Sequence, residues 1–170
     1  MKNIEKSKAQ ISKLIQELSR KLPKFSDGRI DYTNSKIAPV ITIFVKHKGK
    51  ILLLKRSDKV LEYKNLWNTV SGYLDELKPI EEKAKEELKE EVGIEGKDIS
   101  EIKLGEIYKF TDRTIQKTWV ILPILVQLNE KPKIKLDWEH SEYKWIAPED
   151  LKKYAIVPKL QKSWQNLQES

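Results

Sequence analysis

The spacing of apolar residues along the chain predicts where helices and strands form. Residues 3–22 repeat apolar side chains at helical intervals, which predicts an amphipathic helix that ends at Pro23. Residues 39–46 and 50–55 are rich in β-branched residues and leucines. Because a short polar segment with Gly49 separates these two runs, we expect them to form a β-hairpin.

The remaining pattern predicts one more prominent helix and several strands. Residues 79–92 are expected to be helical, since Pro79 suits a first turn and Gly93 suits a helix end. The order of strands, helix, strands and helix is typical of a mixed α/β (α+β) domain rather than of a regular alternation. Further strands are expected at residues 29–32, 67–73, 102–110, 117–127 (broken at Pro123) and 142–146, and further helices from Pro148 and over residues 158–167.

Length and composition exclude several classes of protein. A chain of 170 residues suits one domain with a core of its own. The absence of cysteine excludes disulfides, thiol catalysis and cysteine-based zinc sites, and two histidines are too few for a histidine-rich metal site. The longest uncharged runs, residues 118–129 and 65–74, are shorter than the roughly 20 residues that span a bilayer. Since the N-terminal residues also lack signal-peptide character, we expect a cytoplasmic protein without a membrane partner.

Charge is distributed unevenly along the chain. The net charge of +7 arises from 33 basic and 26 acidic residues, and a basic balance is typical of proteins that bind nucleic acids or other polyanions. Between Gly72 and Glu101, however, eleven acidic residues stand beside only five lysines. This acidic segment in a basic protein therefore needs a function of its own.

Three glutamates of the acidic segment share one patch of the predicted helix 79–92. Glu87, Glu90 and Glu91 are three and four residues apart, which places them side by side at the edge of the apolar stripe. Carboxylates so close repel one another, and a divalent cation would remove the repulsion. Their oxygens suit Mg²⁺ or Mn²⁺. The other interpretation is the solvated surface of an ordinary glutamate-rich helix. Such a surface normally interleaves lysines, as this helix is expected to do elsewhere, at Lys83, Lys85 and Lys89.

The sequence around this helix resembles the Nudix box, G-x5-E-x7-R-E-U-x-E-E-x-G-U, where U is a bulky aliphatic residue. The spacing agrees without a gap over residues 72–94, and the similarity extends over roughly residues 39–154. The resemblance implies a Nudix-type α/β/α sandwich around a mixed sheet over residues 36–170, with residues 1–35 as an N-terminal extension. The box positions that agree are Gly72, Glu87, Leu88, Glu90, Glu91, Gly93 and Ile94.

Two positions depart from the box. Lys78 stands where the family has a glutamate, and Glu86 stands where it has an arginine. In the family these residues are generally taken to form an ion pair that braces the loop against the helix. Because both signs are exchanged, we expect Lys78 and Glu86 to form the same structural ion pair with reversed polarity. The alternative is a degenerate box without activity.

Nudix enzymes hydrolyse nucleoside diphosphates linked to another group, by attack of water on phosphorus. In some members a glutamate on a later loop activates the water, so the resemblance makes Glu139 the preferred catalytic base here. Glu142 and His140 are the alternatives. The resemblance also implies a set of ligands for Mg²⁺ or Mn²⁺: Glu87, Glu90, Glu91 and the carbonyl of Gly72. The three glutamates of this set are also candidate catalytic residues.

Residues near the ends of predicted strands are candidates for substrate binding. Arg56 is expected to contact phosphate through its bidentate guanidinium, with Lys55 beside it. Tyr73, Trp67 and Tyr63 are expected to stack on a nucleotide base, although aromatic residues at strand ends are more often part of a core. The N-terminal helix is expected either to form a homodimer or to pack on its own domain through its apolar residues, among them Ile4, Ile11 and Leu18.

The sequence thus predicts a Mg²⁺-dependent pyrophosphohydrolase for a small nucleotide or diphosphate substrate, with two alternatives. Isopentenyl diphosphate isomerases share the fold, and residues 66–69 resemble them faintly, but they are generally described as using a catalytic cysteine, which this chain lacks. A non-catalytic module that binds nucleotides or RNA through a degenerate box would also agree with the net charge of +7.

Overall fold

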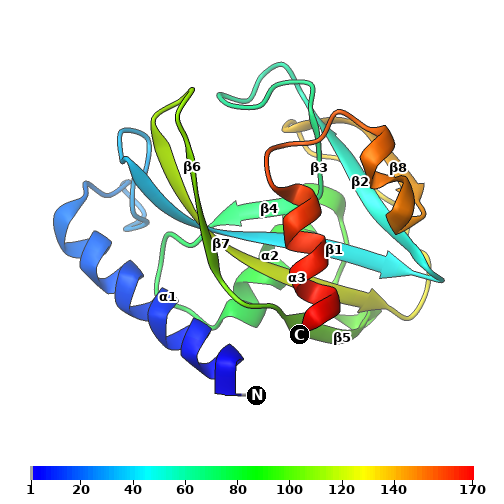
Figure 1. Ribbon diagram of the computed structural model, residues 1–170, viewed down its shortest axis with the longest axis horizontal. Coiled ribbons are helices and arrows are strands. Elements are labelled where there is room, and N and C mark those ends of the chain that lie inside the picture. The colour runs from blue at the N-terminus through cyan, green and yellow to red at the C-terminus, as the bar shows by residue number, and fades with distance from the viewer. Residues whose placement is uncertain (1) are drawn as a thin grey trace.

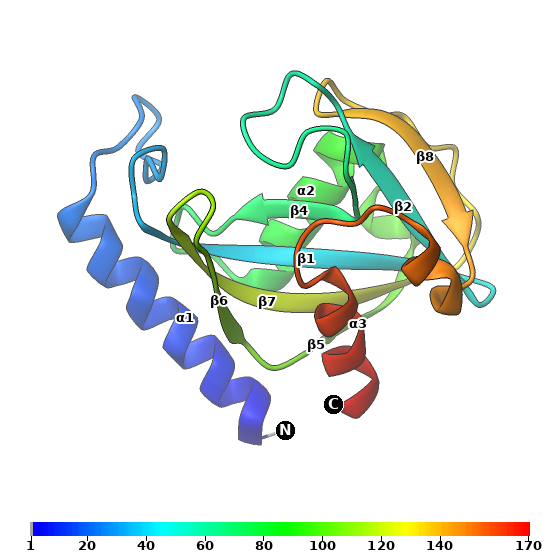
Figure 2. The same ribbon diagram turned by 45° about the horizontal axis from the view of Figure 1, so that its top comes forward.

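The strands form one eight-stranded sheet with helices on both of its faces (Figure 1 and Figure 2). The computed structural model describes residues 2–170. Within them, no helix is both long enough and apolar enough to cross a membrane. The elements in chain order are α1 (Lys2–Lys21), β1 (Ile37–His47), β2 (Lys50–Arg56), β3 (Trp67–Asn68), β4 (Val70–Tyr73), α2 (Ile80–Val92), η1 (Gly96–Asp98), β5 (Ile99–Leu104), β6 (Tyr108–Asp112), β7 (Lys117–Leu128), β8 (His140–Ile146), η2 (Pro148–Lys153) and α3 (Leu160–Glu169).

Strand β1 lies at the centre of the sheet and joins its two halves. It pairs antiparallel with β2 and β4 and parallel with β7. The sheet continues from β2 to β3 and β8, and from β7 to β5 and β6, all antiparallel. The predicted hairpin between β1 and β2 is confirmed, and it turns through Lys48 and Gly49, both of which have positive φ.

The central strands send alternate side chains to two apolar cores. On β1, Ile43 and Val45 belong to the core that α1 and α2 cover, whereas Phe44 faces the other side and packs against Trp164 of α3. Helix α2 buries the predicted stripe of Ile80, Ala84, Leu88 and Val92. Since helices cover both faces of a mixed sheet, the expected α/β/α architecture is confirmed.

Helix α1 packs on the sheet of its own chain. Ile11, Ile15 and Leu18 are buried in the same core as α2. On the polar side, the ammonium of Lys8 lies 2.7 Å from Glu81 Oε1 at the start of α2. The apolar face of α1, which was considered for dimerisation, therefore contacts its own domain.

Strand β7 continues through Pro123, contrary to the predicted break. On one side Pro123 lies opposite Thr42 of the parallel strand β1. On the other side its carbonyl accepts a hydrogen bond of 2.9 Å from Gly105, between the end of β5 and the start of β6. Because proline has no N–H to donate, the interruption falls in the neighbouring segment. Residues 102–110 thus belong to two strands instead of one.

Three other predicted elements differ in detail. Residues 67–73 form two short strands separated at Thr69, whose hydroxyl donates a hydrogen bond of 2.5 Å to the Ile43 carbonyl. Residues 29–32 form no strand, and Ile30 makes only an isolated bridge with Lys24. The segment from Pro148 is a 3-10 helix instead of an α-helix.

Candidate active site

A cavity of about 290 Å³ opens between α2, strands β4 and β7, and the loop that follows β2. Its lining combines carboxylates, two arginines and aromatic rings. The carboxylates that face it include Glu87, Glu90 and Glu91 of α2 and Glu139 from the loop before β8. The structure thus brings all four candidate catalytic glutamates to one cavity.

Helix α2 determines the positions of these glutamates. Its buried apolar stripe fixes the rotation of the helix about its axis, and its C-terminal cap fixes where the helix ends. Gly93 adopts the left-handed conformation with φ 73°, and its N–H bonds back to the last turn. With the stripe buried against the sheet, Glu87 and Glu91 lie at its edge and are only 9% and 2% exposed. Glu90, one position away from that edge, is exposed to solvent.

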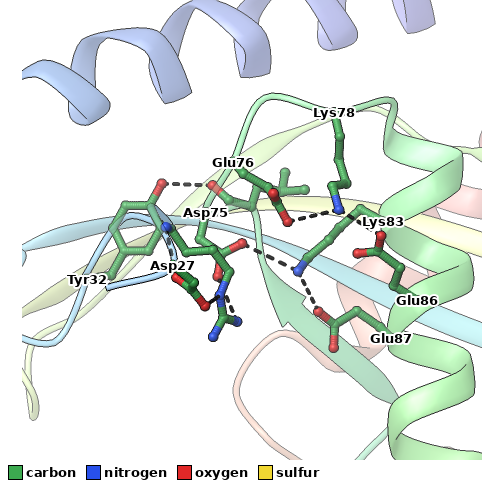
Figure 3. Close-up of polar contacts among 10 residues, drawn as sticks. Asp27, Tyr32, Asp75, Glu76, Lys78, Lys83, Glu86 and Glu87 are labelled. Atoms are coloured by element: carbon green, nitrogen blue, oxygen red, sulfur yellow. Dashed lines mark hydrogen bonds and ion pairs between the residues drawn. The ribbon is translucent and has the colours of Figure 1, made fainter. Parts of the chain in front are cut away.

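The Glu87 carboxylate lies directly against the backbone of Gly72 on β4. A Cβ at position 72 would collide with this carboxylate, so only glycine leaves it room. On its other side, Glu87 Oε1 is 3.0 Å from the ammonium of Lys83, which also lies 3.4 Å from Asp75 (Figure 3). Lys83 is only 5% exposed. The prediction that Lys83 belongs to a solvated face is wrong, since this lysine is buried between two carboxylates.

Glu91 lies deeper in the same cluster. The backbone N–H of Ser71 donates a hydrogen bond of 3.4 Å to Glu91 Oε2, and His140 Nε2 lies 3.8 Å from the same oxygen. The other nitrogen of this buried histidine, Nδ1, is 3.0 Å from Asp137 Oδ1. Burial lowers the pKa of His140, so a neutral imidazole is favoured beside Glu91. His140 therefore lies behind Glu91 rather than in the cavity lining.

Burial and mutual repulsion raise the pKa values of the clustered carboxyls. Burial, with the nearby charges of Glu90 and Glu139, raises the pKa of Glu87 to about 7. The pKa of the fully buried Glu91 is raised well above its usual range by burial and then by Glu139 and Glu87. Each carboxyl would ionise more readily if a cation balanced the others.

The residues present fit a divalent metal by the chemistry of their donors. The donor atoms are carboxylate oxygens, which Mg²⁺ and Mn²⁺ prefer. Burial, followed by the neighbouring carboxylates, disfavours the ionised forms of Glu87 and Glu91 and raises their pKa values, and a bound cation would offset both effects. Among residues 2–170, however, no three acidic or histidine side chains already converge as a metal-binding group.

The predicted substrate-binding residues divide into two sets. Arg56 and Tyr73 line the cavity, as does Tyr63. Lys55 and Trp67 do not line it: Trp67 is buried beside Tyr154 in the core under α3, and the ammonium of Lys55 lies 6.0 Å from the Trp67 ring.

The candidate bases also differ in position. Glu139 lines the cavity, and its pKa is raised by burial and by Asp137, while Arg56 opposes the shift. The backbone N–H of Ser57, the residue after Arg56, donates a hydrogen bond of 2.7 Å to the Glu139 carbonyl. Glu142 is exposed on β8 and does not line the cavity. The geometry thus favours Glu139 over Glu142.

The two residues that depart from the box contact each other. Lys78 Nζ lies 2.7 Å from Glu86 Oε1 and 2.9 Å from Glu76 Oε1 (Figure 3). The hydrogen bonds with both glutamates raise the pKa of Lys78, that with Glu86 first. The ammonium thus joins the loop before α2 to the middle of the helix, with reversed polarity.

Trp119 and Arg29 are among the residues that line the cavity but were not predicted from the sequence. Trp119 Nε1 donates a hydrogen bond of 3.1 Å to the Tyr63 hydroxyl, which donates one of 2.8 Å to Asp112. Tyr73 and Trp119 lie with ring centroids 6.1 Å apart. Arg29 reaches the cavity from the segment after α1. Because Trp119 and Arg29 lie outside residues 72–94, the motif gave no indication of their position at the site.

Comparison with protein families gives one match. The profile of the NUDIX domain matches residues 36–167, which is most of the chain. None of the curated protein sequences matches this chain.

Solved structures with the same fold are numerous, and three illustrate the range. A NUDIX hydrolase from Nitrosomonas europaea has a TM-score of 0.65 at 17% identity, over 79% of this chain and 90% of that one. An Ap4A hydrolase from C. elegans, in a binary complex, has a TM-score of 0.61 at 23% identity, over 78% and 95%. The NUDIX domain of Shewanella oneidensis NrtR, complexed with ADP ribose, has a TM-score of 0.62 at 17% identity, over 78% and 86%. At these identities the similarity shows the fold.

Proposed function

Because this chain belongs to the Nudix family of pyrophosphohydrolases, we propose that it hydrolyses a phosphoanhydride bond in a nucleoside diphosphate-linked substrate with the help of Mg²⁺ or Mn²⁺. One observation carries the proposal: the box carboxylates, Glu139, Arg56 and a group of aromatic rings all line one cavity. Such a substrate requires carboxylates that bind its metal ion, an arginine that binds its phosphate and aromatic rings that stack on its base.

The metal would be held by Glu87, Glu90 and Glu91, with the carbonyl of Gly72 close to Glu87. When bound, a divalent ion neutralises phosphate charge and lowers the pKa of a bound water. The buried Lys83 would orient the Glu87 carboxylate, because its ammonium lies 3.0 Å from Glu87 Oε1 and is itself held 3.4 Å from Asp75 Oδ1.

The side chains of the cavity would divide the remaining chemistry between them. Arg56 binds a phosphate oxygen through two of its N–H groups. Glu139 accepts a proton from the attacking water as the new oxygen–phosphorus bond forms and the anhydride oxygen–phosphorus bond breaks. The raised pKa of Glu139 suits a group that takes up a proton in the reaction.

The aromatic rings would bind the nucleotide base. Tyr73 is 38% exposed, and its ring and that of Tyr63 both lie beside Trp119. A base that stacks on an exposed ring of this kind gains about 1–3 kcal/mol. The hydrogen bonds among Tyr63, Trp119 and Asp112 fix the orientation of two of the rings.

Release of phosphate or of nucleotide products from a panel of anhydrides tests the proposal. The panel includes ATP, ADP-ribose and diadenosine tetraphosphate, the last two because similar folds are described with ADP ribose and as an Ap4A hydrolase. We expect the wild-type protein to cleave at least one compound with Mg²⁺ or Mn²⁺ and none with excess chelator. Failure to cleave any of them with either ion, together with tight binding of RNA, would favour the non-catalytic module instead.

A further inference from the structure

The segment between α1 and β1 is built into the wall of the cavity, although it lies outside the residues that the NUDIX profile matches. The backbone N–H of Ile30 donates a hydrogen bond of 2.8 Å to the carbonyl of Asp75. The hydroxyl of Tyr32 donates one of 2.8 Å to the carbonyl of Leu74, and its ring stacks on that of Tyr73 at 5.4 Å. These contacts attach residues 30–32 to the loop that follows β4.

Arg29 stands in this segment with its guanidinium at the cavity. Its Nε donates a hydrogen bond of 2.7 Å to Asp27 Oδ2, and Asp27 Oδ1 accepts another from the Arg29 backbone. Its Nη1 lies 3.6 Å from Asp75 Oδ2, which is beyond a hydrogen bond. Within residues 2–170 neither Nη group donates a hydrogen bond, so their four N–H donors remain available at a half-exposed position.

Contacts connect Arg29 and Arg56 to opposite ends of the row of glutamates on α2, Arg29 to the Glu87 end and Arg56 to the Glu91 end. Arg56 lies opposite His140 in the pairing of β2 with β8, and His140 Nε2 lies 3.8 Å from Glu91 Oε2. From Glu87 a chain of ion pairs runs through Lys83 to Asp75 (Figure 3). Asp75 Oδ2 in turn lies 3.6 Å from Nη1 of Arg29.

These two arginines are the only basic residues that line the cavity within residues 2–170. The chain contains 33 basic residues, and only four of them are arginines. Half of the arginines thus face the cavity, and none of the described lysines does. An anion in the cavity therefore meets planar guanidinium groups, each of which can donate hydrogen bonds to two oxygens at once, rather than the point charges of lysines.

We propose that Arg29 is a phosphate-binding residue of the site, which contacts a substrate phosphate on the side of the carboxylate cluster opposite Arg56. Asp27 holds the guanidinium by its Nε edge and leaves the Nη edge for the ligand. The proposal rests on the proposed function, since it assumes a substrate with phosphates on both sides of the metal-binding glutamates. A substrate with one phosphate would need only Arg56.

Equilibrium binding of two probes tests this role. The probes are a non-hydrolysable methylene analogue of ATP, which has three phosphates, and AMP, which has one. For Arg29→Gln we expect the Kd of the ATP analogue to rise about tenfold or more, as is typical for loss of a charge-assisted hydrogen bond, while the Kd of AMP is unchanged. Arg20→Gln is the matched control, because Arg20 is exposed on α1 and does not line the cavity.

The outcomes separate a binding role from a structural one. The proposal is overturned if wild type and Arg29→Gln bind the ATP analogue with equal Kd values, or if the substitution raises the Kd values of the ATP analogue and of AMP by the same factor. It is also overturned if wild type does not bind the ATP analogue at all. If Arg29→Gln unfolds below the assay temperature, Arg29→Lys is measured by the same criterion, since lysine keeps a cation beside Asp27. Cleavage of the anhydride panel by wild type tests the proposed function separately, because it does not depend on the result for Arg29.

Discussion

Gly72 and Glu87 are matched to each other at the scale of single residues. The carboxylate of Glu87 occupies the space that a side chain at position 72 would need. Position 72 has no positive φ, so space rather than backbone conformation requires the glycine. The box glycine thus makes room for a carboxylate at a position within strand β4.

Gly72→Ala is therefore expected to lower activity much more than stability. The added methyl group displaces the end of a flexible glutamate side chain, which moves without disturbing the backbone. We expect kcat/KM to fall about tenfold or more while the free energy of unfolding falls by less than about 1 kcal/mol. Gly96→Ala is the control, because its nearest neighbour, Lys85 Cδ, would lie at an ordinary 3.8 Å. An unchanged kcat/KM in Gly72→Ala would contradict this role for the glycine.

Single residues of the site were predictable when a local motif contained them. Glu87, Glu90 and Glu91 lie in the cavity as the spacing of the box implies. Lys83 was misjudged because sequence spacing does not show that Asp75 and Glu87 enclose it from two elements. Arg29 was missed because it reaches the cavity only through contacts 46 residues along the chain, at Asp75.

At the scale of elements, the ion pair between Lys78 and Glu86 joins the loop before α2 to the helix. Exposed pairs of this kind contribute only about 0–1 kcal/mol, so its effect lies in the position of α2. Glu76 adds a second carboxylate on Lys78, which concentrates negative charge around one ammonium. Removal of that ammonium leaves two carboxylates facing each other.

Exchange of the two charges tests the brace. We expect Lys78→Glu and Glu86→Arg each to lower kcat/KM several-fold, with unfolding free energies that change by less than about 1 kcal/mol. The double variant is expected to regain most of the loss, since a pair of the opposite polarity can then form. Lys85→Glu, on the exposed side of α2, controls for the change of net charge. If the losses in kcat/KM of the two single variants simply add in the double variant, the two residues act independently and the brace is contradicted.

Element types were predicted better than their limits. The hairpin of β1 and β2 and the helix α2 agree with the apolar pattern, because both bury a regular face. The break assigned to Pro123 was wrong because this proline lies beside the gap between β5 and β6, where a ladder N–H is not needed, while the pairing of β7 with β1 continues past it. Its partner on β1, Thr42, lies 81 residues away, and no local pattern reveals it.

At the scale of the whole molecule, the N-terminal helix is part of the main core rather than an appendage. Ile11 is 1% exposed and packs in the core that contains Leu88 of α2. The segment after α1 then continues to Arg29 and the cavity wall. Stability and site geometry are thus linked through α1.

Ile11→Ala is expected to destabilise the whole molecule. Removal of a buried isoleucine to alanine costs about 2–5 kcal/mol, because apolar burial is lost and a cavity remains. We expect one cooperative transition at lower denaturant concentration, monitored by tryptophan fluorescence. Leu61→Ala provides the comparison, since Leu61 is 86% exposed and its loss should cost less than about 0.5 kcal/mol. A separate early transition for α1 alone would contradict the single core.

The uneven charge of the chain has a consistent explanation at this scale. The acidic excess between Gly72 and Glu101 includes Asp75, Glu87, Glu90 and Glu91, which line the cavity, while the protein as a whole carries +7. A positive molecule attracts a polyphosphate substrate, and the acidic patch supplies the cations that the same substrate needs. Membership of the Nudix family, expected from the box, is confirmed by the profile match.

The most direct test of this account is the rate of Mg²⁺-dependent cleavage by Glu90→Gln, measured on the compound that wild type cleaves fastest. Glu90 is exposed, so its amide variant should fold as wild type does. We expect kcat/KM to fall at least about a hundredfold, because a carboxylate of the metal site is lost. Glu82→Gln, exposed on the same helix and outside the cavity, should retain wild-type activity. Equal Mg²⁺-dependent rates for wild type and Glu90→Gln would contradict the account.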